Sequence, residues 1–208
     1  MPLVSRSRVG AVAFDRLIRD GTCTALSPAF ALPRDIPETP GLRALAVRDS
    51  VPAHTVLSGL GGLWVALGGP PPPVLDVVGA RGLHRVVTTD TPATGVPATP
   101  QVAFHSGLAH TEASVTLMGL TVANIGRCCI DALRWGRHAL AIPAVAGAVR
   151  GGDVTMEALH SAFAADHPRG PGHARLRSVW NGLAPALAGL SAAHESGVTT
   201  AGRAALSP

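Results

Sequence analysis

The sequence contains no lysine and no tyrosine, and only 3% of its 208 residues are aromatic. All 17 basic side chains are therefore arginines, and with 13 acidic residues the formal net charge is +4. A charge of this size permits nucleic-acid binding but does not require it. Because GC-rich codons favour arginine, alanine, glycine and proline, coding bias explains much of this composition.

Cysteine is scarce as well. The three cysteines are Cys23 and the adjacent pair Cys128 and Cys129. An odd number with an adjacent pair excludes a disulfide framework and indicates a reducing compartment. No histidine lies near Cys128 in the sequence, so we expect no nucleophilic thiol. Cys129 is expected to be a small core residue.

Long hydrophobic runs are missing. The longest spans residues 139–149, with 11 residues that include Pro143, whereas a membrane helix needs about 20. The first twenty residues contain four arginines and two aspartates and have no apolar core of a signal peptide. We therefore expect a cytoplasmic protein without a membrane partner.

Catalytic motifs are missing too. Residues 59–69 are rich in glycine, but they lack the Lys-Ser/Thr that follows in a phosphate-binding loop. His105, His110 and Glu112 lack the spacing of a metal site. With no serine elbow and no paired carboxylates, the sequence predicts no enzyme, no cofactor and no metal.

The residue pattern predicts an α+β fold with four segments: a winged-helix-like head (1–33), a linker (34–40), an α/β domain with a small mixed sheet and a C-terminal helical bundle (41–190), and a flexible tail (191–208). The following strands are expected: 74–78, 101–105, 113–118 and 120–123. The main helices expected after the linker are 41–49, 58–67, 124–136, 139–150 and one that Thr155 caps.

The head is expected to contain one helix over residues 5–20, stopped by Gly21 and followed by strands at 22–26 and 29–32. A helix, a glycine and a two-stranded ribbon form the last parts of a winged helix, whose recognition helix enters the major groove. The alternative is a packing helix whose basic side is only solvated. Arginines on this segment are the candidate DNA contacts: Arg6, Arg8, Arg16 and Arg19.

Further arginines lie in the C-terminal half. Arg127, Asp131 and Arg134 follow the i, i+4, i+7 spacing that favours ion pairs along a helix. They form either a site for DNA or a partner or, as we prefer, a structural network that ties the helix to the sheet. Arg169, Arg175 and Arg177 accompany a single aspartate in residues 166–177, which form either a solvated loop or a contact to nucleic acid or an acidic partner.

Several phrases resemble one family. The block over residues 56–85 has Ser58, Gly61, Gly62, Trp64 and Leu67, then Pro70 to Pro73 and an apolar strand. Arg16, Leu17, Arg19 and Gly21 match a phrase before a wing, and Arg127, Asp131 and Arg134 match a later helix. In these phrases the chain resembles actinobacterial antitoxins and transcriptional regulators of the AbiEi type.

The resemblance implies a regulator that binds operator DNA through its head and represses its own operon. It also implies that the C-terminal part counters a nucleotidyltransferase-like toxin. Many relatives continue with a nuclease-like domain that carries carboxylates, but Glu195 is the only acidic residue after Leu187 here. Because the head is short and its second strand is neutral, the alternative is a degenerate protein-interaction module without DNA binding.

Overall fold

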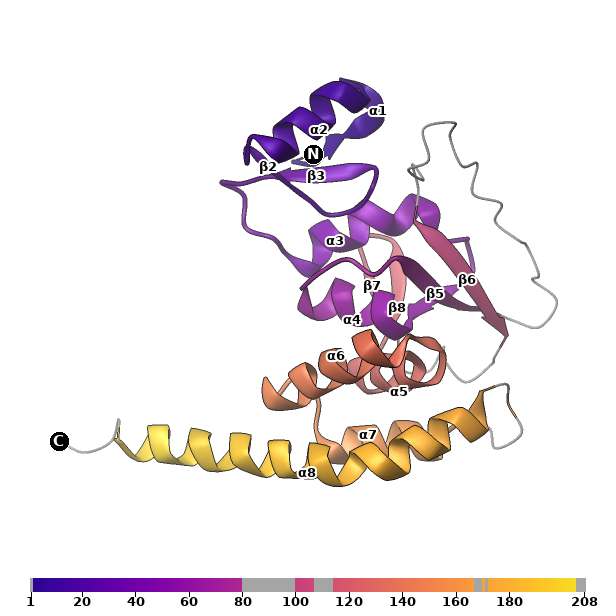
Figure 1. Ribbon diagram of the computed structural model, residues 1–208, viewed down its shortest axis with the longest axis vertical. Helices are drawn as coiled ribbons and strands as arrows, with labels where there is room; N and C mark the ends of the chain where they lie inside the picture. Colours follow the sequence, from indigo (N-terminus) through magenta and orange to yellow (C-terminus); the bar gives the residue numbers. More distant parts are fainter. Residues whose placement is uncertain (1, 80–99, 107–113, 167–169, 171, 205–208) are drawn as a thin grey trace. The chain divides into compact units, whose positions relative to one another are not determined.

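The N-terminal part of this computed structural model places two short helices against a three-stranded antiparallel sheet (Figure 1). The structure describes residues 2–79, 100–106, 114–166, 170 and 172–204. The sheet has the order β1-β3-β2. The elements of this head are β1 (Val4–Ser5), α1 (Arg6–Val9), α2 (Ala11–Arg19), β2 (Cys23–Ala25) and β3 (Phe30–Pro33).

The expected single helix over residues 5–20 is wrong in one respect, because it is broken at Gly10. This glycine has φ of +84°, and its N–H donates to the carbonyl of Arg6 at 2.9 Å. Only glycine adopts such a backbone conformation at no steric cost, so the chain changes direction there. The ribbon formed by β2 and β3 confirms the two expected strands, and β1 adds a third that the sequence did not indicate. The wider winged-helix arrangement stays a prediction.

A second sheet of five strands follows, in the order β6-β5-β4-β8-β7. Its two parallel pairs are β4 with β8 and β5 with β6, whereas the pairs β4–β5 and β7–β8 are antiparallel. The predicted small mixed sheet is therefore confirmed. Met118 and Gly119 join β7 to β8 with φ of 51° and 82°, as a tight hairpin turn requires. The strands are β4 (Val56–Ser58), β5 (Val74–Gly79), β6 (Gln101–Ser106), β7 (Ser114–Leu117) and β8 (Leu120–Ala123).

The glycine-rich block lets helix α4 (Gly59–Leu67) pack closely on this sheet. Gly59 has φ of +57°, and a Cβ atom there would lie 2.9 Å from Oδ2 of Asp76 in β5. A Cβ at Gly61 would lie 3.0 Å from Cδ1 of Leu57. The helix ends at Leu67 with Gly68, whose φ is +87°, as its C-cap, and the four prolines that follow cannot continue it. The predicted order of helix, proline stop and strand is thus confirmed.

Helix α3 (Pro40–Val47) begins with Thr39 as its N-cap, and the turn η1 (Arg48–Ser50) follows it. Arg43 is buried and donates from Nε to the carbonyl of Val65 at 3.0 Å and from Nη2 to that of Ala66 at 3.2 Å. These carbonyls belong to the last turn of α4, where helical partners are lacking. Arg43 therefore joins α3 to the end of α4.

Four helices form the C-terminal part: α5 (Ile125–Trp135), α6 (His138–Arg150), α7 (Met156–Ala164) and α8 (His173–Ala204). Asn124 and Thr155 are the N-caps of α5 and α7, as predicted. The side chain of Asn124 accepts from the amide of Arg127 at 2.7 Å, and that of Thr155 accepts from the amide of Ala158 at 3.1 Å.

The structure divides the chain into the units Met1–Ala123 and Asn124–Pro208. The sequence instead placed a boundary after residue 33 and kept residues 41–190 together. The head belongs with the five-stranded sheet because it packs on α3, where the buried Ser27 hydroxyl donates to the carbonyl of Ala46 at 3.3 Å. The expected tail over residues 191–208 overlaps the end of α8, which continues to Ala204, and its flexibility stays a prediction. None of the helices in the described residues combines the length and the apolar character needed to span a membrane.

Candidate nucleic-acid interface

Helix α2 owes its orientation to one apolar side. Phe14, which is 1% exposed, packs with Cys23 of β2 and Ala31 of β3. Leu17 and Ile18 are partly buried against the same cluster. Because these three positions share one side of the helix, the side opposite Phe14 must face solvent.

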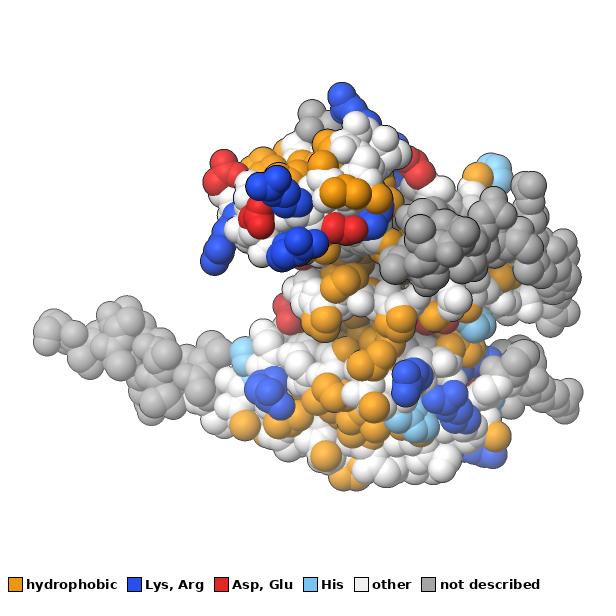
Figure 2. Space-filling view, turned by 45° about the horizontal axis from the view of Figure 1, so that its top comes forward, with side chains coloured by type: hydrophobic (Ala, Val, Ile, Leu, Met, Phe, Trp, Pro, Cys, Tyr) orange, Lys and Arg blue, Asp and Glu red, His pale blue; other side chains and the backbone are white. Residues whose placement is uncertain are grey.

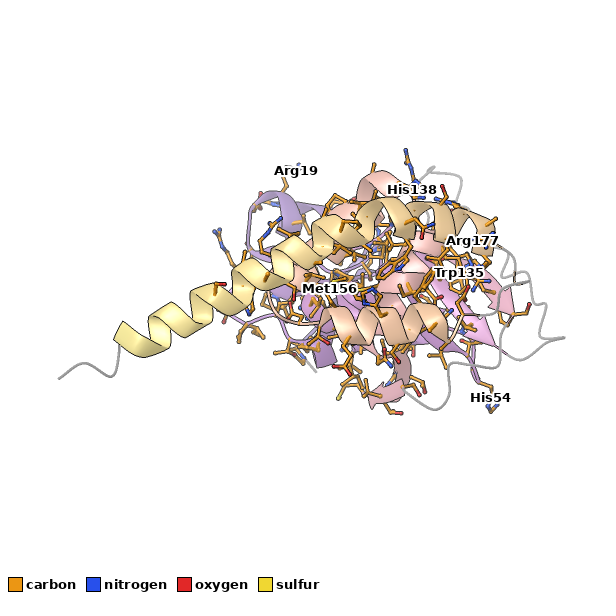
Figure 3. The ribbon with its side chains drawn as sticks, turned by 90° about the horizontal axis from the view of Figure 1, so that it is seen from below. Arg19, His54, Trp135, His138, Met156 and Arg177 are labelled. Carbon is orange, nitrogen blue, oxygen red and sulfur yellow. The ribbon has the colours of Figure 1, made fainter. Side chains whose placement is uncertain are left out.

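The outward side of α2 carries Val12, Arg16 and Arg19, spaced at i, i+4 and i+7. Val12 is 84% exposed, and the side chain of Arg16 is 78% exposed. Arg19 is exposed as well, and Figure 3 shows its side chain extending away from the ribbon. Arg8, in the separate helix α1, is also exposed. Three of the four expected DNA contacts are therefore accessible on the head.

The fourth, Arg6, holds the head together instead. Its Nη2 donates to Oδ2 of Asp15 at 2.9 Å, and its guanidinium carbon lies 5.1 Å from the centre of the Phe14 ring. A guanidinium over an aromatic face contributes about 0.5–1 kcal/mol at exposed sites. Arg6 thus links α1 to α2, and its expected contact with DNA stays a prediction.

Acidic side chains flank the outward side of α2. Asp15 is held by Arg6, while Asp20 accepts from Nε of Arg16 at 3.4 Å across solvent-exposed side chains. Such an exposed pair contributes only about 0.2–1 kcal/mol and is easily exchanged for another anion. Blue and red side chains accordingly alternate on the head, at the top of Figure 2.

Arg127 and Arg134 lie in a buried network within the C-terminal unit. Arg127 donates to Asp131 from Nε at 3.0 Å and from Nη2 at 2.5 Å. Its Nη2 also lies 3.3 Å from Oδ1 of Asp166, to which Nη1 of Arg134 donates as well. His173 completes the network, with Nδ1 at 2.8 Å from Oδ2 of Asp166.

This network indicates that the charged side chains of α5 stabilise the fold. Arg127 and Arg134 are each 7% exposed, so neither offers a surface to DNA or a partner. Burial by itself would lower the pKa of Arg127, but the negative charges of Asp131 and Asp166 outweigh it, and the pKa is raised. The preferred structural alternative fits the geometry with one correction: the network ties α5 to Asp166 and to the start of α8, not to the sheet.

Two residues of this network, Asp166 and His173, were not proposed from the sequence. The one available signal was that Asp166 is the only acidic residue in the arginine-rich run over residues 166–177. A buried aspartate among several arginines is expected to accept their hydrogen bonds, because an unpaired buried charge is costly.

The expected contact by Arg175 and Arg177 does not form one surface. The two residues are two positions apart on α8, so their side chains leave the helix about 160° apart. Arg175 is engaged locally, donating from Nη2 to the carbonyl of Gly136 at 2.6 Å and from Nε to His138 at 3.0 Å. Arg177 is exposed (Figure 3), and Arg169 lies outside the described residues.

His105 faces an aspartate rather than a metal site. Its Nε2 lies 2.9 Å from Oδ1 of Asp76 on the neighbouring strand β5. His110 and Glu112 lie outside the described residues. Among those that are described, no three histidine, cysteine, aspartate or glutamate side chains form a group able to hold a metal ion.

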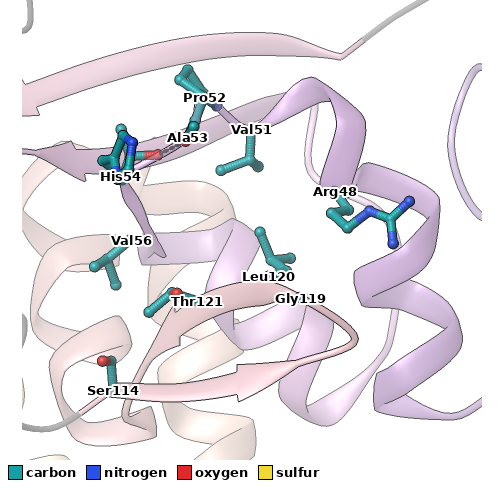
Figure 4. Close-up of a pocket in the computed structure, with 11 residues that line it drawn as sticks. Arg48, Val51, Pro52, Ala53, His54, Val56, Ser114, Gly119, Leu120 and Thr121 are labelled. Carbon is teal, nitrogen blue, oxygen red and sulfur yellow. Dashed lines mark hydrogen bonds between the residues drawn. The ribbon is translucent and has the colours of Figure 1, made fainter.

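A cavity of about 520 Å³ lies between the connection from η1 to β4 and the β7–β8 hairpin (Figure 4). Its size would suit a small ligand. However, Arg48 donates to Asp49 at 3.1 Å, and the Thr55 hydroxyl donates to the carbonyl of Pro52 at 2.7 Å. These two side chains are thus engaged in local hydrogen bonds, while His54, Ser114 and Thr121 also line the cavity.

The adjacent cysteines are core residues. Cys128 and Cys129 are both 0% exposed. Burial, with a smaller effect of the negative charge of Asp153, raises the pKa of Cys129 to about 12. A thiol with this pKa is protonated at neutral pH and is a poor nucleophile. The expectation of a small core residue at Cys129 is confirmed.

The sequence matches no family model and no curated protein.

Proposed function

We propose that the chain is a DNA-binding transcriptional regulator of the AbiEi antitoxin type, which contacts the operator of its own operon through α2. The outward side of this helix carries the proposal, because Arg16 and Arg19 are accessible there while Phe14 anchors the opposite side. Arg8 adds a third exposed cation from α1. An exposed helix with arginines on one side suits the major groove, which admits an α-helix.

The charges of the head favour an anionic partner. Its helices contain four arginines and one aspartate, and Asp20 follows at the end of α2. Arg8 and Arg19 form no ion pair with any residue that the structure describes. Phosphate contacts by such arginines release counterions from DNA, so affinity falls steeply as salt rises.

The test compares two double variants that lose the same charge. R16A/R19A removes the two outward arginines of α2, while R137A/R150A removes two exposed arginines of the C-terminal unit. Binding to the DNA upstream of the gene is measured by fluorescence anisotropy between 50 and 300 mM salt. We expect R16A/R19A to lower affinity at least tenfold. The slope of log affinity against log salt concentration should become shallower by about two, because two phosphate contacts are lost. R137A/R150A should change both quantities much less.

Equal losses of affinity in the two double variants would show a general effect of net charge. They would contradict a specific contact between α2 and DNA. No binding by the wild-type chain would favour the second candidate, a protein-interaction module of the same type that no longer binds DNA. The ion pairs of Asp15 with Arg6 and of Asp20 with Arg16 favour that candidate, since they reduce the positive charge of the helix.

The proposed partner of the C-terminal part is a nucleotidyltransferase-like toxin. This proposal rests on the phrases that resemble the AbiEi type and on no single contact. Co-expression with the product of a neighbouring nucleotidyltransferase-like gene tests it, because a cognate antitoxin restores the growth that the toxin inhibits. Continued growth inhibition in the presence of the chain would contradict the pairing.

A further inference from the structure

Val12 stands out on the surface of the head. At 84% exposure it is the most exposed large apolar side chain in the part of the chain that the structure describes; the next is Met118 at 55%. Neither packing nor helix formation favours a valine at this place, because its β-branch lowers helix propensity. It lies instead in the first turn of α2, on the side that faces away from Phe14.

The neighbours of Val12 along α2 are the two outward arginines. Arg16 lies about 6 Å further along the helix axis and Arg19 about 10 Å, from the rise of 1.5 Å per residue. Asp15 lies near Val12 too, but its carboxylate is held by Arg6 at 2.9 Å. An apolar contact followed by two guanidinium groups further along the helix is thus the chemistry that this side of α2 offers.

The major groove presents groups that match both kinds of side chain. Guanine offers two acceptors to an arginine, and thymine is the one base that offers an apolar group, its C5-methyl. Base edges in this groove distinguish sequences, whereas phosphate contacts mainly position the protein.

We propose that Val12 contacts the C5-methyl group of a thymine and so determines part of the sequence preference of α2. This inference rests on the proposed DNA binding and adds which base edge the helix reads. Arg16 and Arg19, which lie one and two turns of α2 after Val12, contact guanine edges or phosphates near that thymine.

The test removes the same methyl contact once from the DNA and once from the protein. A duplex is first selected from a randomised library by binding to the wild-type chain. Each thymine is then replaced in turn by deoxyuridine, which lacks only the C5-methyl. For the wild type, one replacement should weaken binding about fourfold, the effect expected for one buried methyl group. For V12A the same replacement should have no effect, and V12A should bind the unmodified duplex about as weakly as the wild type binds the modified one.

The matched control is V115A, which shortens another exposed valine in β7, 54% exposed. It should retain the wild-type response to deoxyuridine. V12A should fold at least as stably as the wild type, because alanine is the better helix former; thermal unfolding checks this. If every replacement affects V12A and the wild type equally, Val12 does not contact a thymine methyl group, whereas the proposed DNA binding is still supported. If the library yields no bound duplex, the proposed function fails together with this inference.

Discussion

Arg127 and Asp131 lie one helical turn apart in α5 and are joined by two parallel hydrogen bonds at 3.0 and 2.5 Å, with Asp131 completely buried. The pair matches the flat guanidinium to both oxygens of the carboxylate, the geometry in which arginine binds a carboxylate most strongly.

Removing one partner should strongly destabilise the C-terminal unit. Asp131→Ala leaves Arg127 buried with less compensating charge, which typically costs about 3–5 kcal/mol. Urea unfolding followed by circular dichroism measures the change. Asp49→Ala is the control, since Asp49 pairs with Arg48 in the solvent and its loss should cost at most about 1 kcal/mol. Equal losses in the two variants would show that burial does not set the strength of the Arg127 pair.

Gly59 should tolerate no side chain. Gly59→Ala would place a Cβ atom 2.9 Å from Oδ2 of Asp76 and would keep a φ of +57°. Strained backbone conformations of this kind cost about 1–3 kcal/mol, so thermal unfolding should occur at a lower temperature. Gly147→Ala is the matched control, because nothing lies within 4 Å of its added Cβ inside helix α6. That variant should gain up to about 1 kcal/mol; a similar loss in both would contradict the close approach of Asp76.

The buried thiol of Cys129 should make stability depend on pH at the alkaline end. The folded chain holds the pKa of Cys129 near 12, whereas an unfolded cysteine loses its proton near pH 8.5. The stabilising effect is therefore complete below about pH 8.5 and is lost as pH rises towards 12.

Between pH 9 and pH 10 the wild type should lose roughly 1 kcal/mol of unfolding free energy relative to Cys129→Ala. Urea unfolding of both proteins at the two pH values measures this difference. Parallel losses in the wild type and the variant would assign the pH dependence to other groups.

Asp20 should restrain the contact of α2 with DNA. Asp20→Asn removes a negative charge and frees Arg16 from its exposed pair. We expect affinity for the selected duplex to rise a few-fold at low salt and the gain to shrink as salt screens the charges. Asp35→Asn, which neutralises another exposed aspartate of the same unit, serves as the control. An equal gain in both variants would indicate only long-range attraction.

The sequence was sufficient to predict a helix end or a turn wherever the residue responsible lies in or next to that element. Asn124 and Thr155 cap their helices through their own side chains, and Met118-Gly119 fixes the hairpin by its positive φ angles. The prolines after α4 prevent the helix from continuing, because proline lacks the amide donor that a helix needs. These features follow from neighbours in the chain, so the sequence was sufficient to predict them.

The candidate interface was predictable only in part. Helical spacing indicated that Arg16 and Arg19 share a side of α2, and the structure places them there. The same reasoning could not separate Arg6 from them, because its partners, Asp15 and the ring of Phe14, depend on the break at Gly10.

By itself, the sequence determined the caps of α5 and α7, the turn between β7 and β8, the strands other than β1 and β4, and the basic side of α2, because each depends on periodicity or on adjacent residues. Tertiary structure alone decided which charges are buried. Arg127 and Arg134 meet Asp166 only when the end of α7 is brought back to α5. The energy of such charges depends on distance and on exclusion of water, and neither is set until the helices pack.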